Sequence, residues 1–253
     1  MYKIRFHLTV YRYELIVACI ILLLTGSVAV SSRSDEPAFP SQYRYPYRIA
    51  LTFDDGPHPL YTSLLIRILK ESDARATFFV VGKQAVEYPY LLKDLSLAGN
   101  EIEDHTFTHP NLSKLSDAQV QREVLDTASV IKDITGVAPH FYRPPGGQFN
   151  AQVQKNLQDS GMHMALWTVF PKDHEENDPQ IIIKRVLDQA TDGGVVLLHS
   201  GRNSTVLALP VIIRELRSKG YRFVTLEELA GSMQSGQLAW LDMGAHNGAH
   251  SGY

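Results

Sequence analysis

Two carboxylates stand side by side in the stretch LTFDDGPHP, residues 51–59, where an apolar run meets Gly and Pro. Like charges this close repel each other unless a cation or a hydrogen-bond donor compensates them. If Asp55 binds a divalent metal ion, the ion removes much of that repulsion, and Asp54 can remain ionised beside it as a general base. The alternatives are a plain turn at the end of a strand, and a magnesium or calcium site.

Two imidazoles follow in HTFTH, where His105 and His109 are four residues apart. This spacing brings two side chains together on one helical face or at a strand-to-helix bend. Taken alone, the pair is weak evidence for a metal site, and the alternative is a turn cap at His105 with a surface residue at His109. Two histidines with one aspartate are a known catalytic zinc pattern, and imidazole suits zinc or a similar transition metal better than magnesium.

Arg143 in YRPPGG and His199 in VVLLHS are the other candidate reactive groups. Arg143 enters a stiff turn, from which it could orient or neutralise Asp54, while the N–H of Gly146 could point at a developing oxyanion. The alternative is a solvated arginine in a Pro-Gly turn. His199 ends an apolar run, where a histidine is often a satisfied core residue, but opposite a metal site it would be well placed as a general acid.

Short apolar runs alternate with helical patterns along the chain, which favours a parallel α/β sheet, either open or closed into a barrel. In such sheets the carboxyl ends of the strands converge, and the candidate groups all follow predicted strands. Helices are predicted over 116–136, 178–194 and 205–220, with Pro210 starting or kinking the last one. The predicted strands are residues 48–53, 76–81, 100–103, 140–142, 163–169, 194–199 and 221–226.

The 253 residues, 44% of them apolar and 20% charged, suffice for one sizeable core with at most a small appendage. A formal net charge of −3 and the lack of a long basic run argue against a nucleic-acid partner. A linker is expected over 32–46, one globular domain over 47–230, and a flexible tail over 231–253, in which His246 and His250 read as solvated histidines.

The N-terminus carries three basic residues before an uncharged apolar run over 15–30. This pattern predicts a signal peptide or membrane anchor over 1–31, with small residues at 27 and 29 that would suit cleavage. The protein body is then periplasmic, extracellular or anchored to the outer face of the inner membrane, and it touches the membrane only through this segment. The single cysteine, Cys19, lies inside it, so the body has no disulfide and no cysteine metal ligand.

From about residue 47 to residue 230 the sequence resembles the polysaccharide deacetylase family, the NodB-homology carbohydrate esterases of family four. The resemblance rests on TFDDGPHP, ATFFVVGK, EIEDHTFTHPNL, FYRPPGG, LWTV, VVLLHSG with TVLALP, and GYRFVTLEEL. It implies a distorted (β/α) barrel of about seven strand-helix units, in agreement with the seven predicted strands.

The resemblance also implies roles for individual residues. Asp54 would be the general base, Arg143 the group that orients it, and His199 the general acid, while the metal would be held by Asp55, His105 and His109. Leu197 and Trp167 would join Gly146 at the substrate. The implied metal is divalent, zinc first, with cobalt or nickel as alternatives.

The implied reaction is hydrolysis of N-acetyl groups on the sugars of a polysaccharide, with peptidoglycan as the leading substrate. An O-acetyl esterase acting on a glycan such as xylan and a catalytically silent glycan-binding protein are the alternatives. The sequence does not predict an oligomeric state.

One motif departs from the family pattern. WTVFPKDH places Phe170 and His174 where the family commonly has Asp and Trp. Asp173 matches the aspartate that pairs with the acidic histidine, and so is the expected partner of His199. The altered residues leave substrate specificity open, and His174 is either an ordinary loop histidine or an additional proton donor or metal contact.

Overall fold

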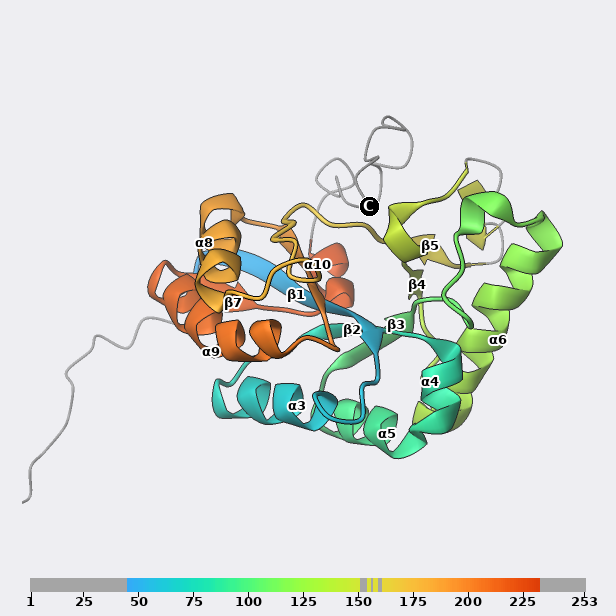
Figure 1. Cartoon of the computed structure of the whole chain (residues 1–253), viewed down its shortest axis with the longest axis horizontal. Helices are drawn as coiled ribbons and strands as arrows, with labels where there is room; N and C mark the ends of the chain where they lie inside the picture. The colour runs from blue at the N-terminus through green and yellow to red at the C-terminus, as the bar shows by residue number, and fades with distance from the viewer. Residues whose placement is uncertain (1–44, 151–153, 156, 159–160, 233–253) are drawn as a thin grey trace, which may run out of the picture. The chain divides into compact units, whose positions relative to one another are not determined.

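The computed structural model describes residues 45–150, 154–155, 157–158 and 161–232. Seven strands, parallel at every pairing, form one curled sheet in the order β5-β4-β3-β2-β1-β6, with β7 also paired to β1 (Figure 1). The strands are β1 (Tyr47–Gly56), β2 (Thr77–Val80), β3 (Glu101–Asp104), β4 (Phe141–Tyr142), β5 (His163–Met164), β6 (Gly194–His199) and β7 (Tyr221–Phe223).

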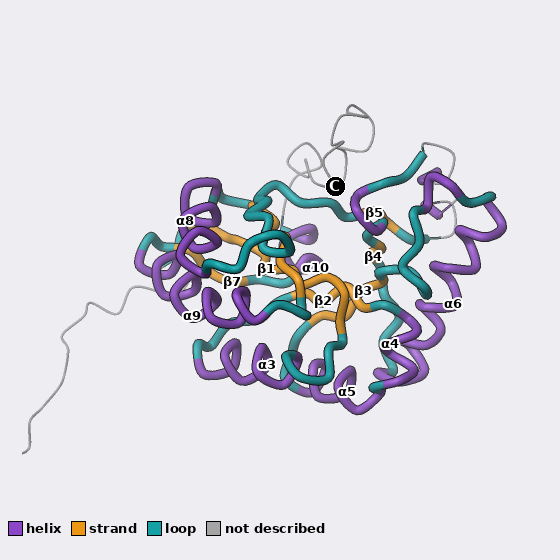
Figure 2. Tube along the Cα trace, viewed as in Figure 1, coloured by secondary structure: helices purple, strands orange, loops and turns teal. Residues whose placement is uncertain are grey.

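Helices lie around the outside of this sheet, as Figure 2 shows, and the result is the distorted α/β barrel that the sequence predicts. They are α3 (Thr62–Glu71), α4 (Gly82–Glu87), α5 (Pro89–Leu97), α6 (Asp117–Thr135), α8 (Pro179–Gln189), α9 (Asn203–Ser218) and α10 (Leu226–Gly231), with the short 3₁₀ turns η1 (Leu112–Lys114) and η2 (Pro145–Gly147).

The central strand β1 is buried on both faces, as expected of a parallel strand covered by helices. Leu51 and Phe53 belong to the larger apolar cluster, which includes residues of α3, α8 and α9. The alternate residues, Thr52 and Asp54, are buried polar side chains that face the other way. Strand alternation thus directs one set of β1 residues to the helices and the other to the interior where the polar groups meet.

The chain after β5 turns back to the far side of the sheet. Val169 forms a parallel bridge with Val196 of β6, and the N–H of Leu197 donates to the carbonyl of Val169 at 3.0 Å. The predicted strand over 163–169 is therefore wrong in extent, because only His163 and Met164 pair with β4. The apolar run is continuous in the sequence, but its first two residues pair with β4 at one end of the strand order and Val169 pairs with β6 at the other.

The ends of α6 agree with the sequence prediction. Ser116 and Gln119 form a reciprocal capping box at its start, and Gly136 ends it with a left-handed φ of 80°. Pro210 does not start its helix, because α9 begins at Asn203 and continues through the proline. Pro210 lies on the exposed side, while Leu209 and Ile212 beside it are buried and keep the helix against the sheet.

No helix in the described part of the chain is both long and apolar enough to cross a membrane. The predicted targeting segment over 1–31, most of the predicted linker, Cys19, and the tail histidines lie outside the described residues.

Candidate active site

The predicted reactive groups do meet at the carboxyl ends of the strands. Asp54 of β1 and His199 of β6 are partners in the strand register, and the N–H of Ser200 donates to the carbonyl of Asp54 at 2.9 Å. His105 follows β3 directly, and Arg143 follows β4. Four strands of one sheet therefore supply side chains to one place.

Asp54 and Asp55 reach the same site because the strand is irregular between them. The β1–β2 register shifts between Phe53 and Gly56, and Asp55 has a left-handed φ of 62°. In a regular strand, consecutive side chains point to opposite faces. The bulge and the left-handed backbone at Asp55, both within β1, therefore bring the two side chains to one site.

Asp55, His105 and His109 form a compact group of three ligand-type side chains, whose ligand atoms all lie within 4.8 Å of one another. Oδ1 of Asp55 lies 3.4 Å from Nε2 of His105 and 3.1 Å from Nε2 of His109. Burial alone would raise the pKa of Asp55, but the two imidazoles outweigh burial and hold it well below its usual range. The carboxylate is therefore ionised at neutral pH.

These residues fit a divalent metal ion. Oδ1 of Asp55 is a buried atom that makes no hydrogen bond of good geometry within the described residues, although the outer part of the side chain is exposed. Nδ1 of His105 lies 2.8 Å from the carbonyl of Arg143, which can only accept, so Nδ1 carries the proton and Nε2 presents its lone pair. One carboxylate and two imidazoles are the donor set of a catalytic zinc site with room for further ligands.

Strained backbone is concentrated around this group. Four of the five non-glycine residues with positive φ in the described chain are Asp55, Thr106, His109 and Lys172, each of which is a ligand-type residue of the site or adjoins a site residue. Thr106 is β-branched, so its φ of 67° is unusual, and its N–H is held by Oδ1 of Asp104 at 2.7 Å. Such strain persists only where the surrounding structure enforces it, and it is typical of functional sites.

Arg143 is fully buried and fixed on several sides. Nη1 donates to Oδ1 of Asp54 at 2.7 Å and to Oγ1 of Thr52 at 2.8 Å. Nε and Nη2 donate to the carbonyls of Ala165 and Leu166, each at 3.0 Å. The guanidinium also lies 4.0 Å from the ring centroid of Phe79. A group held in this way fixes one oxygen of Asp54, while the other, Oδ2, lies 3.7 Å from Nε2 of His105.

His199 is paired with Asp173, as predicted. Oδ1 of Asp173 lies 2.8 Å from Nδ1 of His199, and Oδ2 accepts the backbone N–H of His199 at 2.8 Å. Oγ1 of Thr205 donates to the same Oδ2 at 2.6 Å. Burial lowers the pKa of His199, but the hydrogen bond and charge of Asp173 outweigh it, so the pKa is raised above its usual value.

The loop after β5 lines the neighbourhood of His199 with rings. Trp167 lies 5.7 Å from Phe170, and Phe170 lies 5.7 Å from His174 between ring centroids. Trp167 also packs on the turn after Arg143, because a Cβ on Gly147 would come within 2.9 Å of its ring. Of the other predicted substrate contacts, Gly146 is in this turn with φ 63°, and Leu197 is buried in β6.

Sequence reasoning missed two threonines of the site. Thr52 holds Arg143 and lies two residues before Asp54, so strand periodicity places both on one face and was an available signal. Thr205 holds Asp173 from α9, and no local pattern links it to a residue 32 positions earlier.

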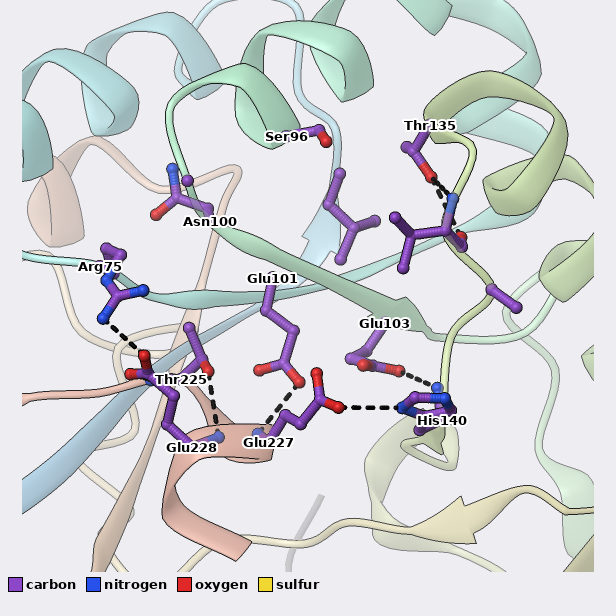
Figure 3. A pocket seen from close by; sticks show the side chains of 14 residues that line it. Arg75, Ser96, Asn100, Glu101, Glu103, Thr135, His140, Thr225, Glu227 and Glu228 are labelled. Atoms are coloured by element: carbon purple, nitrogen blue, oxygen red, sulfur yellow. Dashed lines mark hydrogen bonds and ion pairs between the residues drawn. The ribbon is translucent and has the colours of Figure 1, made fainter. Parts of the chain in front are cut away.

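A separate cavity of about 290 Å³ opens at the amino end of β3 (Figure 3). Glu101 and Glu103 line it, but their oxygens are already engaged: Glu101 accepts the N–H groups of Leu226 and Glu227 at the start of α10, and Glu103 accepts those of His140 and Phe141. Burial, which is the largest effect, raises the pKa of both carboxyls. These acids anchor backbone rather than form a second reactive centre.

Comparison with known proteins agrees with the geometry. The family model for polysaccharide deacetylase matches residues 43–165. The chain is 39% identical over 186 residues to a peptidoglycan-N-acetylglucosamine deacetylase of Bacillus cereus, covering 72% of this chain and 87% of that protein. It is 38% identical over 184 residues to the peptidoglycan-N-acetylglucosamine deacetylase of Listeria monocytogenes, where the match covers 73% of this chain but only 39% of the relative.

Solved structures extend the likeness to the fold. The structure of the peptidoglycan deacetylase PdaC from Bacillus subtilis superposes with a TM-score of 0.70 at 36% identity, covering 73% of this chain and 90% of the compared chain. The full-length PdaC is named a peptidoglycan-N-acetylmuramic acid deacetylase, and the chain spans 38% of its length. On these sequence matches and the shared fold, the chain belongs to the polysaccharide deacetylase family.

Proposed function

We propose that this chain is an exported, metal-dependent hydrolase that removes N-acetyl groups from the sugars of peptidoglycan. The observation that carries the proposal is the position of Asp54, whose Oδ1 is tied to Arg143 while Oδ2 faces His105 of the ligand group. A carboxylate fixed beside a candidate metal site is suited to take a proton from an attacking water. His199, its partner in the strand register, is suited to donate a proton to the leaving amine.

Asp55, His105 and His109 would hold the ion, with zinc favoured by the donor set and cobalt or nickel as alternatives. When bound, a divalent ion supplies Lewis-acid polarisation of the acetyl carbonyl and lowers the pKa of a nearby water.

The other residues divide the proton transfers. Asp54 would take the proton of the water whose oxygen bonds to the acetyl carbon, and Arg143 would keep Asp54 oriented. His199, held protonated by Asp173, would give its proton to the sugar nitrogen as the carbon–nitrogen bond breaks. The products are acetate and a free amine. Asp54 is then protonated and His199 neutral, so one proton must pass from Asp54 to His199, directly or through solvent, before the next turnover. Gly146, Leu197 and Trp167 are the proposed substrate contacts.

The substrate proposal rests on the relatives, which are named for deacetylating peptidoglycan. They differ in the sugar, which is N-acetylglucosamine for two of them and N-acetylmuramic acid for the third. A cell-wall substrate requires export, which residues 1–31 would direct. The proposed organisation of the rest of the chain is a linker over 32–46, a catalytic domain over 47–230 and a tail over 231–253.

The test is acetate release by the purified chain from peptidoglycan, N-acetylated chitooligosaccharides and acetyl xylan, before and after chelation and again after zinc is restored. We expect acetate from peptidoglycan, loss on chelation and recovery with zinc. His105→Ala should lose both bound zinc and activity. Activity that survives complete removal of metal would contradict the metal mechanism, and release from acetyl xylan alone would make the protein an O-acetyl esterase.

A further inference from the structure

A second group of metal-ligand side chains adjoins the first. Asp173, His174 and His199 each offer one ligand atom, and these atoms lie within 4.8 Å of one another. The group shares no residue with Asp55, His105 and His109, yet it has the same chemistry, which is one carboxylate and two imidazoles. This donor set is suited to zinc and related transition metals.

The carboxylate of this group is rigidly placed. Asp173 is fully buried, and its Oδ2 accepts both the N–H of His199 at 2.8 Å and Oγ1 of Thr205 at 2.6 Å. Its Oδ1 faces the imidazole of His199, with 2.8 Å to Nδ1. One oxygen is therefore used to fix the carboxylate, and the other lies against the ring of His199.

The ring of His174 is also positioned by its neighbours. It stacks on Phe170, with an interplanar angle of 16°, and its centroid lies 5.1 Å from that of His199. Oε1 of Glu175 lies 3.3 Å from Nε2 of His174, and a carboxylate behind an imidazole is the usual support of a metal-ligating histidine.

We propose that Asp173, His174 and His199 bind a second zinc-class divalent ion when metal is in excess, and that this ion inhibits the enzyme. The inhibitory part rests on the proposed function, in which His199 is the general acid. An imidazolium carries protons on both ring nitrogens, so a histidine bound to metal through either nitrogen cannot be an imidazolium. Metal at this group removes the proton that the leaving amine needs.

The second ion should bind after the first. It competes with the 2.8 Å contact between Oδ1 of Asp173 and Nδ1 of His199, and two divalent ions in neighbouring sites repel each other. His199 is close enough to Asp55 for their charges to interact. In the Asp55 group, Nε2 of His105 already presents its lone pair, since Nδ1 is the atom that faces a carbonyl acceptor. Activation at low zinc and inhibition at higher zinc follow from this order.

The test uses the full chain, stripped of metal and titrated with zinc, with bound zinc measured by equilibrium dialysis and acetate release measured in parallel. His174→Phe keeps a ring to stack on Phe170 but removes the ligand nitrogens, and His174→Gln serves if the larger ring disturbs folding. The matched control is His140→Phe, which removes an exposed histidine whose Nδ1 lies 3.5 Å from a glutamate, Glu227, but which belongs to neither ligand group.

We expect the unmodified chain and His140→Phe to bind one zinc more than His174→Phe or His174→Gln. Over the concentration range in which that zinc binds, acetate release should fall by about tenfold or more in the first two, consistent with the typical weight of general acid catalysis, and should persist in the His174 variants. Equal zinc binding by all four proteins overturns the site. Equal loss of activity in the His174 variants, or full activity with the second zinc bound, overturns the inhibition. If no acetate is released at any zinc concentration, the proposed function and the inhibition both fail, while dialysis still decides the site.

Discussion

Nη1 of Arg143 donates a 2.7 Å hydrogen bond to Oδ1 of Asp54, and both side chains are buried. A buried carboxylate without its partner is costly, whereas an intact buried pair adds little net stability. The main effect of this pair is therefore to fix the position of Asp54. Removing Arg143 should lower both the stability of the protein and the reaction rate.

Replacing the guanidinium with an apolar chain should expose this cost. Arg143→Met is expected to lower the free energy of unfolding by about 3–5 kcal/mol, because it leaves Asp54 buried and unpaired. Urea unfolding of the metal-free protein measures the change. Adding Asp54→Asn to Arg143→Met should recover part of the loss, and a double variant no more stable than Arg143→Met would show that lost packing, not the charge, is responsible.

Asp54→Asn alone tests whether Asp54 is the base and not a metal ligand. The amide keeps the size of the side chain but cannot accept a proton at neutral pH, so acetate release should fall by about 10²–10⁴-fold while one equivalent of zinc still binds. Kinetics and zinc analysis on the same sample decide the matter. Near-normal activity would mean that another group is the base, and loss of zinc would make Asp54 a ligand.

Asp173 should set the alkaline limit of activity. It outweighs burial and raises the pKa of His199, so His199 keeps its proton above its usual pKa of 6.5. The stability that this protonation adds is fully present below pH 6.5 and is lost as the pH rises through the raised value. In Asp173→Asn the alkaline limb of the rate profile should move to lower pH, while Glu175→Gln, an exposed carboxyl nearby, should leave it in place. An unmoved limb in Asp173→Asn would remove His199 from that role.

His199→Ala should discriminate between leaving groups. An amine must be protonated to depart, whereas a nitrophenolate leaves without a proton. We expect the variant to lose about 10²–10⁴-fold on N-acetylated sugars and much less on 4-nitrophenyl acetate. Equal losses on both substrates would argue that His199 binds or orients substrate instead of acting as an acid.

The buried acid at the other end of β3 should make stability depend on pH. Burial, and then the charge of Glu101, raise the pKa of Glu103 well above its usual 4.5, so the folded chain binds a proton that the unfolded chain releases. This contribution is present below pH 4.5 and is lost as the pH rises through the raised pKa. Glu103→Gln mimics the protonated form and should raise the melting temperature increasingly toward alkaline pH. Glu227→Gln, exposed in the same cavity, is the control, and equal effects of the two changes would contradict the assignment.

Much of this fold is readable from the sequence because burial and side-chain type are local signals. β6 occupies the predicted residues 194–199, since a run buried on both faces is apolar throughout. The run over 163–169 misled for the same reason: apolarity records burial, and here Ala165 and Leu166 are buried beside Arg143 without extending β5. The strand with which a buried segment pairs is determined by residues that are distant in the sequence.

The same division holds for the site. Aspartate, histidine and arginine at the ends of β1, β3, β4 and β6 predicted the place where these side chains meet. The backbone that makes it possible did not follow from residue type, because Asp55 and Thr106 adopt left-handed conformations that only the surrounding contacts enforce. Thr205 was equally hidden, since its contact with Asp173 exists only after α9 packs against the loop.

Asp54 and His199 face each other across the β1–β6 ladder, so about 140 residues of intervening chain do not set their spacing. Backbone hydrogen bonds between two neighbouring strands fix how far a proton acceptor stands from a proton donor. The loops around the site are attached outside that ladder and can differ in length or composition without altering its repeat. The β1–β6 strand pair can therefore keep the same spacing between the two reactive groups in proteins whose surrounding loops differ and accept different polymers.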